Sequence, residues 1–516
     1  MDFLKKVRLI QGGMGVYVSN WRMAKAVSKD RPGITAGTVS GTGLDVVYVR
    51  LLQLGDPGGH VRRAFYAFDD QFDVSIGRKI LNRYYIEGGK QADTKFAYSP
   101  QHIVHPAAGG NSFPSPSPET QSVALTLDEE VAELLIVTGY AEVWLAKEGH
   151  EGKVFINFLK KVELPLIYTM YGAMLAGVDG VIVGAGNPDG LPAVRSRLVE
   201  HQTVSSDLQV LYRGSGESFH VPFDPRSVAE GKLAQRLLKR PAFLAIVSLE
   251  NLVELLAQSQ TEPPDGFIIE HHTAGGHNAP PQGPLVKDSK GEPQYSEEDE
   301  PDIEVIRNTG IPFWLAGGYN NHQQLKQAIS AGAVGIQVGS NFALTEESGM
   351  KPAYRTAIMD KLKMGTSDEE LVHTTMFSPT GFPFKVAQLE GTLAEESVYS
   401  KRRRVCDISL LKQRGLSKPG PDGSRKLFMR CSAAPVKGFV SKRGLEFNTT
   451  DKRCLCNGLL SAVGLGQIIR QDGDLREEPA IITLGNNLDG IRRLSRNGQT
   501  RYWVRDVVTD ILGERE

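Results

Sequence analysis

Short apolar runs that end at glycines recur through residues 7–340, and this repetition limits the fold more than any other feature of the 516-residue chain. Several of the runs precede a stretch with the spacing of an amphipathic helix. A strand that ends in a glycine turn and leads into a helix is the unit of an alternating α/β fold. We therefore predict an α/β protein with strands at 7–10, 33–39, 154–158, 180–184, 243–247, 266–269, 312–318 and 335–340.

The stretch from Glu270 to Asn278 follows the strand predicted at 266–269 and reads EHHTAGGHN. Enzymes with α/β folds keep their chemistry at the C-terminal ends of strands. The glycine pair before His277 lets the backbone approach a flat ligand, and an imidazole has a pKa near neutrality. His277 is therefore the predicted catalytic residue, either as a base or as a group that orients the substrate. A glycine turn followed by a solvated histidine is the alternative.

A metal site is a second alternative for Glu270, His271, His272 and His277. Successive side chains of a strand point to opposite faces, so His271 and His272 are not expected to reach one ion together. We therefore predict no metal at this stretch. For His271 and His272 we predict a packing or supporting role.

Two late strands end in small residues, at Gly317-Gly318 and at Gly339-Ser340, with one predicted helix between them. Free backbone N–H groups and a serine hydroxyl at such strand ends hold a phosphate in barrel enzymes. Each pair alone would be an ordinary turn, but two pairs at the spacing of a β/α repeat favour a phosphate site. No G-x-G-x-x-G fingerprint of a dinucleotide site is evident, so we expect a cofactor with one terminal phosphate, such as FMN.

The composition is that of a soluble globular protein, with 40% hydrophobic and 23% charged residues. Lys+Arg is 59 and Asp+Glu is 60, so no overall charge points to nucleic acid or an anionic membrane as partner. No apolar run has membrane-spanning length, and residues 1–20 lack the apolar core of a signal peptide. These facts favour a cytoplasmic enzyme, although a large binding protein fits them too.

Five motifs, in this order, resemble the nitronate monooxygenase family, formerly called 2-nitropropane dioxygenases. They are QGGMG at 11–15, EHHTAGGH at 270–277, PFWLAGGY at 312–319, AGAVGIQVGSNFALTEES at 331–348 and SPTGFP at 378–383. Flavin-dependent enoyl-acyl-carrier-protein reductases share these motifs. The resemblance implies a TIM (β/α)8 barrel that binds FMN at the C-terminal ends of its strands, with no metal needed for the chemistry.

The resemblance also implies roles for nine residues, with His277 as the catalytic one. Those matched to cofactor binding are Gly13 and Met14 beside the isoalloxazine, Asn157 near the ring, Gly276 at the flank of the flavin, and Gly317, Gly318, Gly339 and Ser340 at the phosphate.

Two reactions remain open within this resemblance. A nitronate monooxygenase oxidises an alkyl nitronate with O₂, with His277 as base or orienting residue. An enoyl reductase instead uses NAD(P)H and an enoyl thioester, with an acyl carrier protein as partner when it acts in trans for a polyketide or polyunsaturated fatty acid synthase. His277 is followed by Asn278-Ala279-Pro280 where the family often has Arg-Gly, so the substrate is not determined.

We predict a barrel over residues 1–400 with inserted loops at about 91–122, 187–240 and 280–301, the last of which could cover the site as a lid. The resemblance to compact family members ends near residue 400. Residues 401–516 form an extension that holds all four cysteines, Cys406, Cys431, Cys454 and Cys456. Their thiolates could bind zinc or an iron–sulfur cluster, although the spacing is not a standard one. Free thiols are the alternative.

Overall fold

The computed structural model describes residues 2–97, 103–107, 112–113, 121–471, 473–496 and 499–514. Eight parallel strands close into a barrel in the order β1-β15-β14-β12-β11-β7-β6-β2, which confirms the predicted TIM (β/α)8 fold. Their bounds are β1 (Leu9–Gln11), β2 (Thr35–Ser40), β6 (Lys153–Leu159), β7 (Gly180–Gly184), β11 (Ala242–Val247), β12 (Gly266–Glu270), β14 (Phe313–Ala316) and β15 (Gly335–Val338).

Alternate residues of the barrel strands belong to different buried clusters, as the period of a strand requires. In β12, Ile268 packs with Trp314 and Phe155 in the small cluster that fills the barrel, whereas Phe267 and Ile269 pack outward. The indole N–H of Trp314 is satisfied by the carbonyl oxygen of Val7 at 2.8 Å. Because both faces of these strands are buried, the runs are almost continuously apolar, which made them readable in the sequence.

Helices follow the barrel strands and cover the outer face of the barrel. The first, α1 (Trp21–Asp30), begins after Asn20, whose side chain accepts from the N–H groups of Arg22 and Met23. The others before residue 345 are α2 (Leu44–Gln53), α3 (His60–Phe72), α4 (Ile76–Tyr84), α5 (Glu129–Lys147), α6 (Glu163–Leu175), α7 (Leu191–Val199), α8 (Glu250–Ala257), α9 (Ile303–Asn308), α10 (His322–Ser330) and α11 (Ser340–Ala343).

The stretch 187–240, which we expected to be an inserted loop, contains regular structure: α7, β8 (Val204–Leu208), β9 (Val210–Leu211), β10 (Glu217–Phe223) and the 3-10 segment η2 (Pro225–Ala234). Buried and more exposed residues alternate along β10. Such a one-sided strand is less apolar than a barrel strand, and for that reason the stretch looked irregular in the sequence.

The predicted excursion at 91–122 lies partly outside the described residues, at 98–102, 108–111 and 114–120. Its described parts include β3 (Val104–Pro106) and β4 (Ser112–Phe113), and β5 (Gln121–Leu127) starts near its end. Strand β5 joins a four-stranded sheet in the order β3-β5-β10-β8. The third predicted loop, 280–301, contains the 3-10 turn η3 (Glu297–Asp299).

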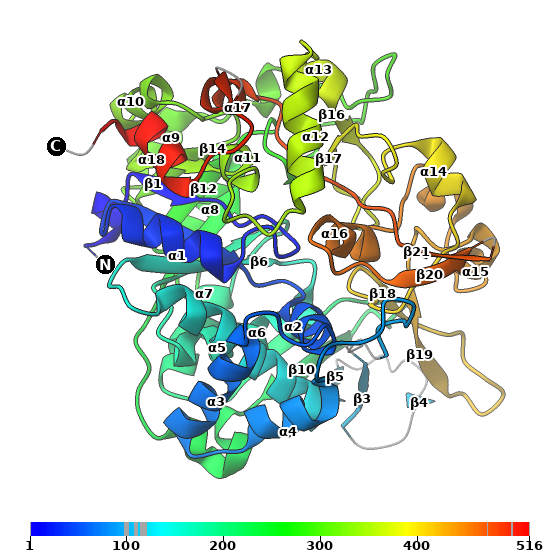
Figure 1. The fold of residues 1–516 in the computed structure, drawn as a ribbon. Coiled ribbons are helices and arrows are strands. Elements are labelled where there is room, and N and C mark those ends of the chain that lie inside the picture. Colours follow the sequence, from blue (N-terminus) through cyan, green and yellow to red (C-terminus); the bar gives the residue numbers. More distant parts are fainter. Residues whose placement is uncertain are drawn as a thin grey trace.

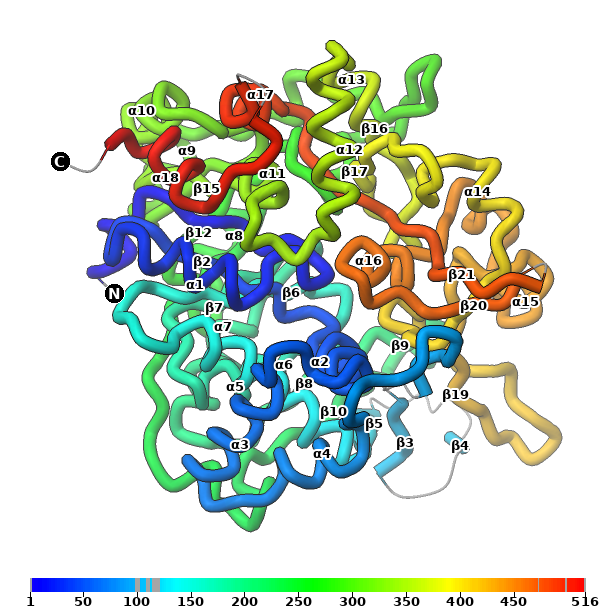
Figure 2. Tube along the Cα trace, in the orientation of Figure 1, coloured from blue at the N-terminus to red at the C-terminus, as the bar shows by residue number. Residues whose placement is uncertain are grey.

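The chain beyond β15 packs on two sides of the barrel (Figure 1). Strand β19 pairs with β4 and β18 with β9, while α18 packs against α1 and α10. Figure 2 shows the chain crossing from the side that carries β20 and β21 to α17 and α18. The elements are α12 (Pro352–Lys363), α13 (Asp368–Leu371), β16 (Val372–Thr375), β17 (Phe384–Ala387), α14 (Glu396–Lys401), β18 (Gln413–Leu416), β19 (Arg425–Arg430), α15 (Val436–Val440), η4 (Glu446–Thr449), α16 (Cys456–Ala462), β20 (Ile468–Gln471), β21 (Asp474–Glu477), α17 (Asp489–Leu494) and α18 (Val504–Leu512).

Residues on both sides of the boundary predicted near residue 400 therefore pair in common sheets, and the division into a barrel and an extension stays a prediction. In the described part of the chain, no helix combines the length and the apolar character needed to cross a lipid bilayer.

Candidate functional site

A cavity of about 1600 Å³, its open mouth included, lies at the C-terminal ends of the barrel strands. Enzymes with this barrel place their active sites at the same end. All nine residues singled out from the sequence line it: Gly13, Met14, Asn157, Gly276, His277, Gly317, Gly318, Gly339 and Ser340. The structure thus brings them together, while the role of each stays a prediction.

One wall of the cavity carries two amide side chains whose oxygen atoms lack a hydrogen-bond partner among the described residues. Asn157 Oδ1 and Gln337 Oε1 are buried and accept no hydrogen bond from the described residues. Gly13 lies against Asn157 so closely that a Cβ atom on Gly13 would stand 2.3 Å from the Asn157 Cβ. Buried amide oxygens are normally hydrogen-bonded, so this wall fits a flat ligand with polar atoms at its edge.

The predicted phosphate turn follows β14. Gly317 and Gly318 have φ values of +85° and +78°, which favour glycine. In the described chain their N–H groups donate to no protein acceptor. After the neighbouring strand β15, Ser340 begins α11 and its Oγ accepts from the Gly485 N–H at 2.8 Å. The turn fits an anionic group, and the serine hydroxyl already bonds to a segment far along the chain.

That segment is 483–487, and the sequence analysis missed it. Thr483, Leu484, Gly485 and Asn487 all line the cavity. The Asn486 N–H donates to the Thr273 carbonyl oxygen at 3.1 Å, and the Asn487 side chain donates to the Gly318 carbonyl oxygen at 2.8 Å. A signal was present, because AIITLG at 480–485 is again an apolar run that ends in glycine.

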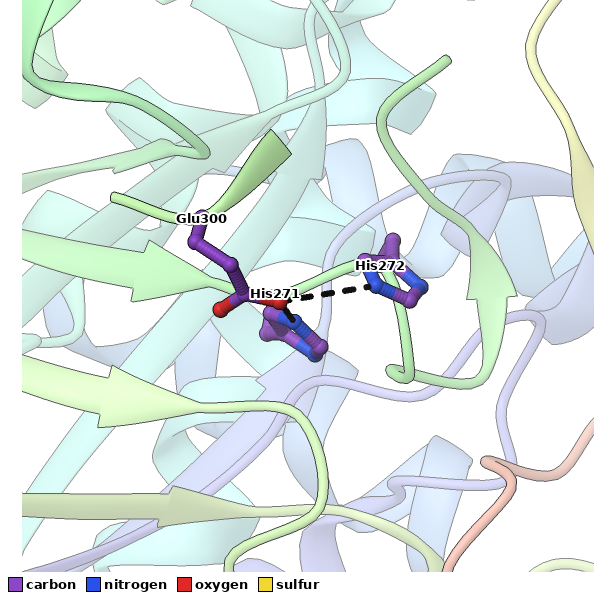
Figure 3. Close-up of side chains that lie close together, drawn as sticks. All are labelled: His271, His272 and Glu300. Carbon is purple, nitrogen blue, oxygen red and sulfur yellow. Dashed lines mark hydrogen bonds and ion pairs between the residues drawn. The ribbon is translucent and has the colours of Figure 1, made fainter. Parts of the chain in front are cut away.

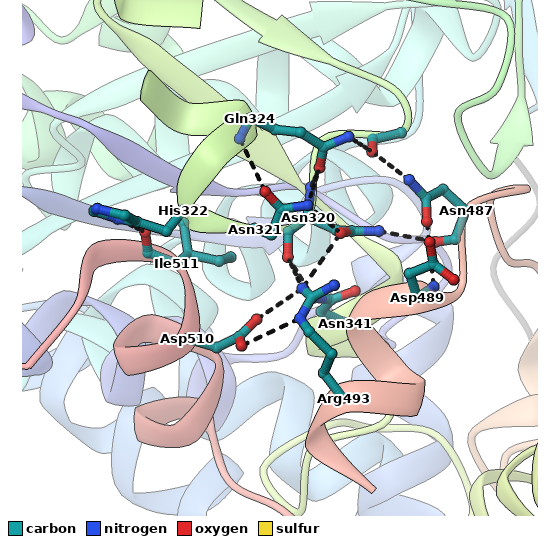
Figure 4. Close-up of polar contacts among 11 residues, drawn as sticks. Asn320, Asn321, His322, Gln324, Asn341, Asn487, Asp489, Arg493, Asp510 and Ile511 are labelled. Carbon is teal, nitrogen blue, oxygen red and sulfur yellow. Dashed lines mark hydrogen bonds and ion pairs between the residues drawn. The ribbon is translucent and has the colours of Figure 1, made fainter. Parts of the chain in front are cut away.

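A polar network of the C-terminal helices holds the turn after Gly318 in place (Figure 4). Arg493 on α17 donates to the carbonyl oxygen of Asn320 at 2.7 Å and pairs with Asp510 on α18 at 2.9 Å. The Asn341 side chain donates to the same carbonyl oxygen at 3.3 Å. The position of the predicted phosphate turn therefore depends on residues beyond 485.

His277 is held at the edge of a small sheet beside the cavity. It lies in β13 (Gly276–His277), which pairs antiparallel with β17. Its Nε2 is 2.6 Å from Ser378 Oγ, and its ring packs edge-on to Phe384 with centroids 4.7 Å apart. Burial lowers the pKa of His277 to about 4, so the imidazole is neutral at neutral pH. Ser378 lies in the SPTGFP motif, but its contact with His277 was not predicted.

Glu270 and Lys385, which lie near each other, both have pKa values shifted toward neutrality. Burial raises the pKa of Glu270, which lines the cavity, to about 7, and nearby Lys385 opposes this rise. Burial also lowers the pKa of Lys385 to about 8. Its Nζ donates to the His272 carbonyl oxygen at 2.6 Å. Glu270 therefore changes charge in the cavity within the physiological pH range.

His271 and His272 lie side by side near Glu300 (Figure 3), with ring centroids 3.9 Å apart. The expectation that they point apart is wrong, because β12 ends at Glu270 and strand alternation does not extend to them. His271 Nε2 is 2.8 Å from Glu300 Oε1, and the His272 ring stacks on Tyr295 at 3.8 Å.

One ligand atom from each of these three residues lies within 4.8 Å of the others, so one ion could touch all three. Neither histidine lines the cavity. The contact of His271 with Glu300 and the stack of His272 on Tyr295 engage both rings, and the supporting role of the histidines stays a prediction. The absence of a metal from the chemistry stays a prediction.

A histidine, two glycine turns and unsatisfied amides surround a cavity at the C-terminal end of a (β/α)8 barrel. This arrangement is typical of the class of barrel enzymes. Within that class, residues 218–376 match the family model for nitronate monooxygenase, which confirms the resemblance inferred from the motifs. The matched range contains His277 and both glycine turns. Gly13, Met14, Asn157 and the segment 483–487 lie outside it.

The chain is also similar to individual proteins. It is 37% identical over 68 residues to a probable nitronate monooxygenase of Bacillus subtilis, which is 13% of this chain and 18% of that protein. It is 27% identical over 116 residues to (3aS,4S,5R,7aS)-5-hydroxy-7a-methyl-1-oxo-octahydro-1H-indene-4-carboxyl-CoA dehydrogenase of Mycobacterium tuberculosis, or 22% of this chain and 29% of that one. The aligned segments thus span less than a third of either relative.

Among solved structures, FabK from Thermotoga maritima aligns with 99% of this chain and 93% of its own, at 13% identity and a TM-score of 0.43.

Proposed function

We propose that this protein is an FMN-dependent oxidoreductase that oxidises alkyl nitronates with O₂. The observation that carries the proposal is the convergence of His277, the unsatisfied amides of Asn157 and Gln337, and the glycine turns on one cavity. The family match over residues 218–376 and the name of the Bacillus subtilis relative support this reaction.

The residues present fit FMN. The turns at Gly317-Gly318 and Gly339-Ser340 would hold its phosphate, and Gly13 and Asn157 would lie along its ring. When bound, FMN supplies the electron acceptor for the substrate and the route of electrons to O₂. Extraction of FAD or NAD, instead of FMN, from the purified protein would contradict this assignment.

His277 would orient the substrate. An imidazole with a pKa of about 4 is a weak base, so His277 is poorly suited to remove a carbon-bound proton from a neutral nitroalkane. A neutral ring can instead hydrogen-bond a nitronate oxygen, with Ser378 fixing the ring orientation. The packing of Phe384 on the imidazole keeps water from one side of it.

The test is His277→Ala, assayed with a neutral nitroalkane and with the pre-ionised nitronate. We expect FMN to stay bound and turnover to fall about 100-fold on both substrates, because both would lose the same orienting bond. Ser378→Ala, which removes the support of the ring together with the Ser378 hydrogen bonds to Thr380, should lose less. A loss confined to the neutral nitroalkane would make His277 a base, and unimpaired turnover on both would exclude it from the mechanism.

A second candidate is an NAD(P)H-dependent reductase of enoyl thioesters, acting on a carrier-protein substrate in trans. The name of the Mycobacterium tuberculosis relative, a CoA-thioester dehydrogenase, favours a thioester substrate. So does the apolar lining of the cavity by Phe158, Leu159, Val162 and Ile246, which suits an acyl chain. Anaerobic mixing with NADPH or with a nitronate distinguishes the two. Flavin bleaching by NADPH, followed by recovery with an enoyl thioester, would favour the reductase.

A further inference from the structure

All four cysteines of the chain line one small cavity. They come from three segments: Cys406 follows α14, Cys431 follows β19, and Cys454 and Cys456 stand at the start of α16. Leu411 and Cys456 line this small cavity and the large one described above, so the two share a wall. Pro379, next to the Ser378 that contacts His277, also lines the small cavity.

The spacing of the sulfur atoms separates two kinds of metal site. Around one tetrahedral zinc ion, with Zn–S bonds of about 2.3 Å, sulfur atoms stand about 3.8 Å apart. Among the described residues, no three cysteine sulfurs fall within 4.8 Å of one another. In an iron–sulfur cluster of the four-iron type each thiolate binds its own iron, so the sulfur atoms stand farther apart. The described sulfur atoms therefore do not group closely enough for a single ion, which leaves a cluster as the metal group to test at these four thiols.

The surroundings match the negative charge of a cluster with four thiolate ligands. Lys412 lines the small cavity, and Arg404 lies within electrostatic reach of Cys431. Arg402 lies within reach of Cys454 but also pairs with Glu478 at 2.9 Å. Hydrogen bonds to the sulfur atoms and nearby charge are the usual means by which a protein supports such a group.

We propose that Cys406, Cys431, Cys454 and Cys456 bind an iron–sulfur cluster in this small cavity, against the wall of the proposed flavin site. Binding would replace the thiol protons with iron. It would also tie together three segments between residues 406 and 456.

The test is anaerobic purification, followed by reconstitution with ferrous iron and sulfide. We expect about four iron and four acid-labile sulfide per chain, and a paramagnetic resonance signal after dithionite reduction. Two outcomes would overturn the proposal: folded, reconstituted protein without iron or sulfide, or one equivalent of zinc in place of iron. FMN content is measured in parallel, so a protein with a cluster and no FMN would contradict the proposed function and leave this inference standing.

Variants separate ligation from folding. Cys406→Ser should lose the cluster and keep FMN, because Cys406 is exposed and lines only the small cavity. Ser432→Ala is the matched control, since Ser432 neighbours Cys431 but makes only a 3.4 Å hydrogen bond to the Pro379 carbonyl oxygen. It should keep both groups. Full iron and sulfide in Cys406→Ser would remove Cys406 from the proposed ligands.

Discussion

The turn at Gly317-Gly318 and the segment at 483–487 meet at one cavity, yet only the first was recognised in the sequence. Both follow an apolar run that ends in glycine. The first run is a barrel strand, β14, paired on both sides with its neighbours. The second is held by single bonds, such as the Ala387 N–H to the Ile482 carbonyl oxygen at 2.8 Å. The same local pattern thus serves a repeated unit in one case and a long-range contact in the other.

The turn lies before residue 400 and the segment beyond it. The strongest test of the comparison is therefore whether these two parts of the chain unfold together. Glu217 on β10 and Arg425 on β19 form a buried ion pair, with N–O distances of 2.5 and 2.9 Å and side chains at most 2% exposed. Glu217→Ala would leave the buried Arg425 without this carboxylate and should cost about 3–5 kcal/mol in the free energy of unfolding. Urea denaturation measures this loss, and we expect one cooperative transition.

The control for that measurement is Asp474→Ala, which removes an exposed pair with Arg476 and should cost about 1 kcal/mol or less. A separate transition for residues beyond 400, unchanged in Glu217→Ala, would show that the regions are independent after all.

A second test compares glycines from the two regions. Gly318→Val would force a side chain into a φ of +78°. Gly485→Val would place a Cβ atom 3.0 Å from the Thr273 carbonyl oxygen and 3.3 Å from Ser340 Oγ. Each change should weaken FMN binding about 30-fold, which is about 2 kcal/mol, measured by titrating apoprotein with FMN.

The matched control for the glycine pair is Gly438→Val on α15, where a Cβ atom would meet nothing within 4 Å. It should leave FMN binding unchanged. If Gly485→Val bound FMN as tightly as the wild-type protein, residues beyond 400 would only border the site.

The barrel could be predicted because each of its strands has a recognisable local sequence pattern. Runs buried on both faces are continuously apolar, and glycine turns such as Gly317-Gly318 follow directly. Contacts between distant segments could not be predicted, because no local pattern specifies the partner. Examples are Ser378 against His277 and Gly485 against Ser340. The side-by-side placement of His271 and His272 was missed because the end of β12 fell one residue before them.

A smaller effect on FMN binding is expected from the hydrogen bond that joins Asn487 to the turn at Gly318. Asn487→Ala removes the 2.8 Å hydrogen bond to the Gly318 carbonyl oxygen and leaves the backbone path unchanged. Loss of such a bond costs about 1 kcal/mol, so FMN should dissociate about fivefold more readily, as measured by the same titration. Asn448→Ala in η4, an exposed residue, is the control. Equal affinities for the two variants would mean that this bond does not position the turn.

The last expected effect is no larger than that of Asn487→Ala, belongs to the barrel side alone and concerns pH. Burial raises the pKa of Glu270 to about 7, against the opposing charge of Lys385, so its carboxyl group is neutral below pH 7 and charged above it. A nitronate is an anion, and a carboxylate in the same cavity repels it. We therefore expect kcat/KM for a pre-ionised nitronate to fall about fivefold from pH 6 to pH 8.5, which is about 1 kcal/mol.

Glu270→Gln should remove the part of this slope near pH 7 and leave the part near pH 8 that comes from loss of the Lys385 charge, whereas Glu298→Gln, at an exposed position of η3, should keep the wild-type slope. Asn487→Ala should also keep that slope, because the C-terminal segment positions the turn and does not titrate near pH 7. A full wild-type slope near pH 7 in Glu270→Gln would assign that titration to another group. A slope that disappears in Asn487→Ala would mean that the two regions control the charge of the cavity together, and that the barrel loops are not a self-sufficient site.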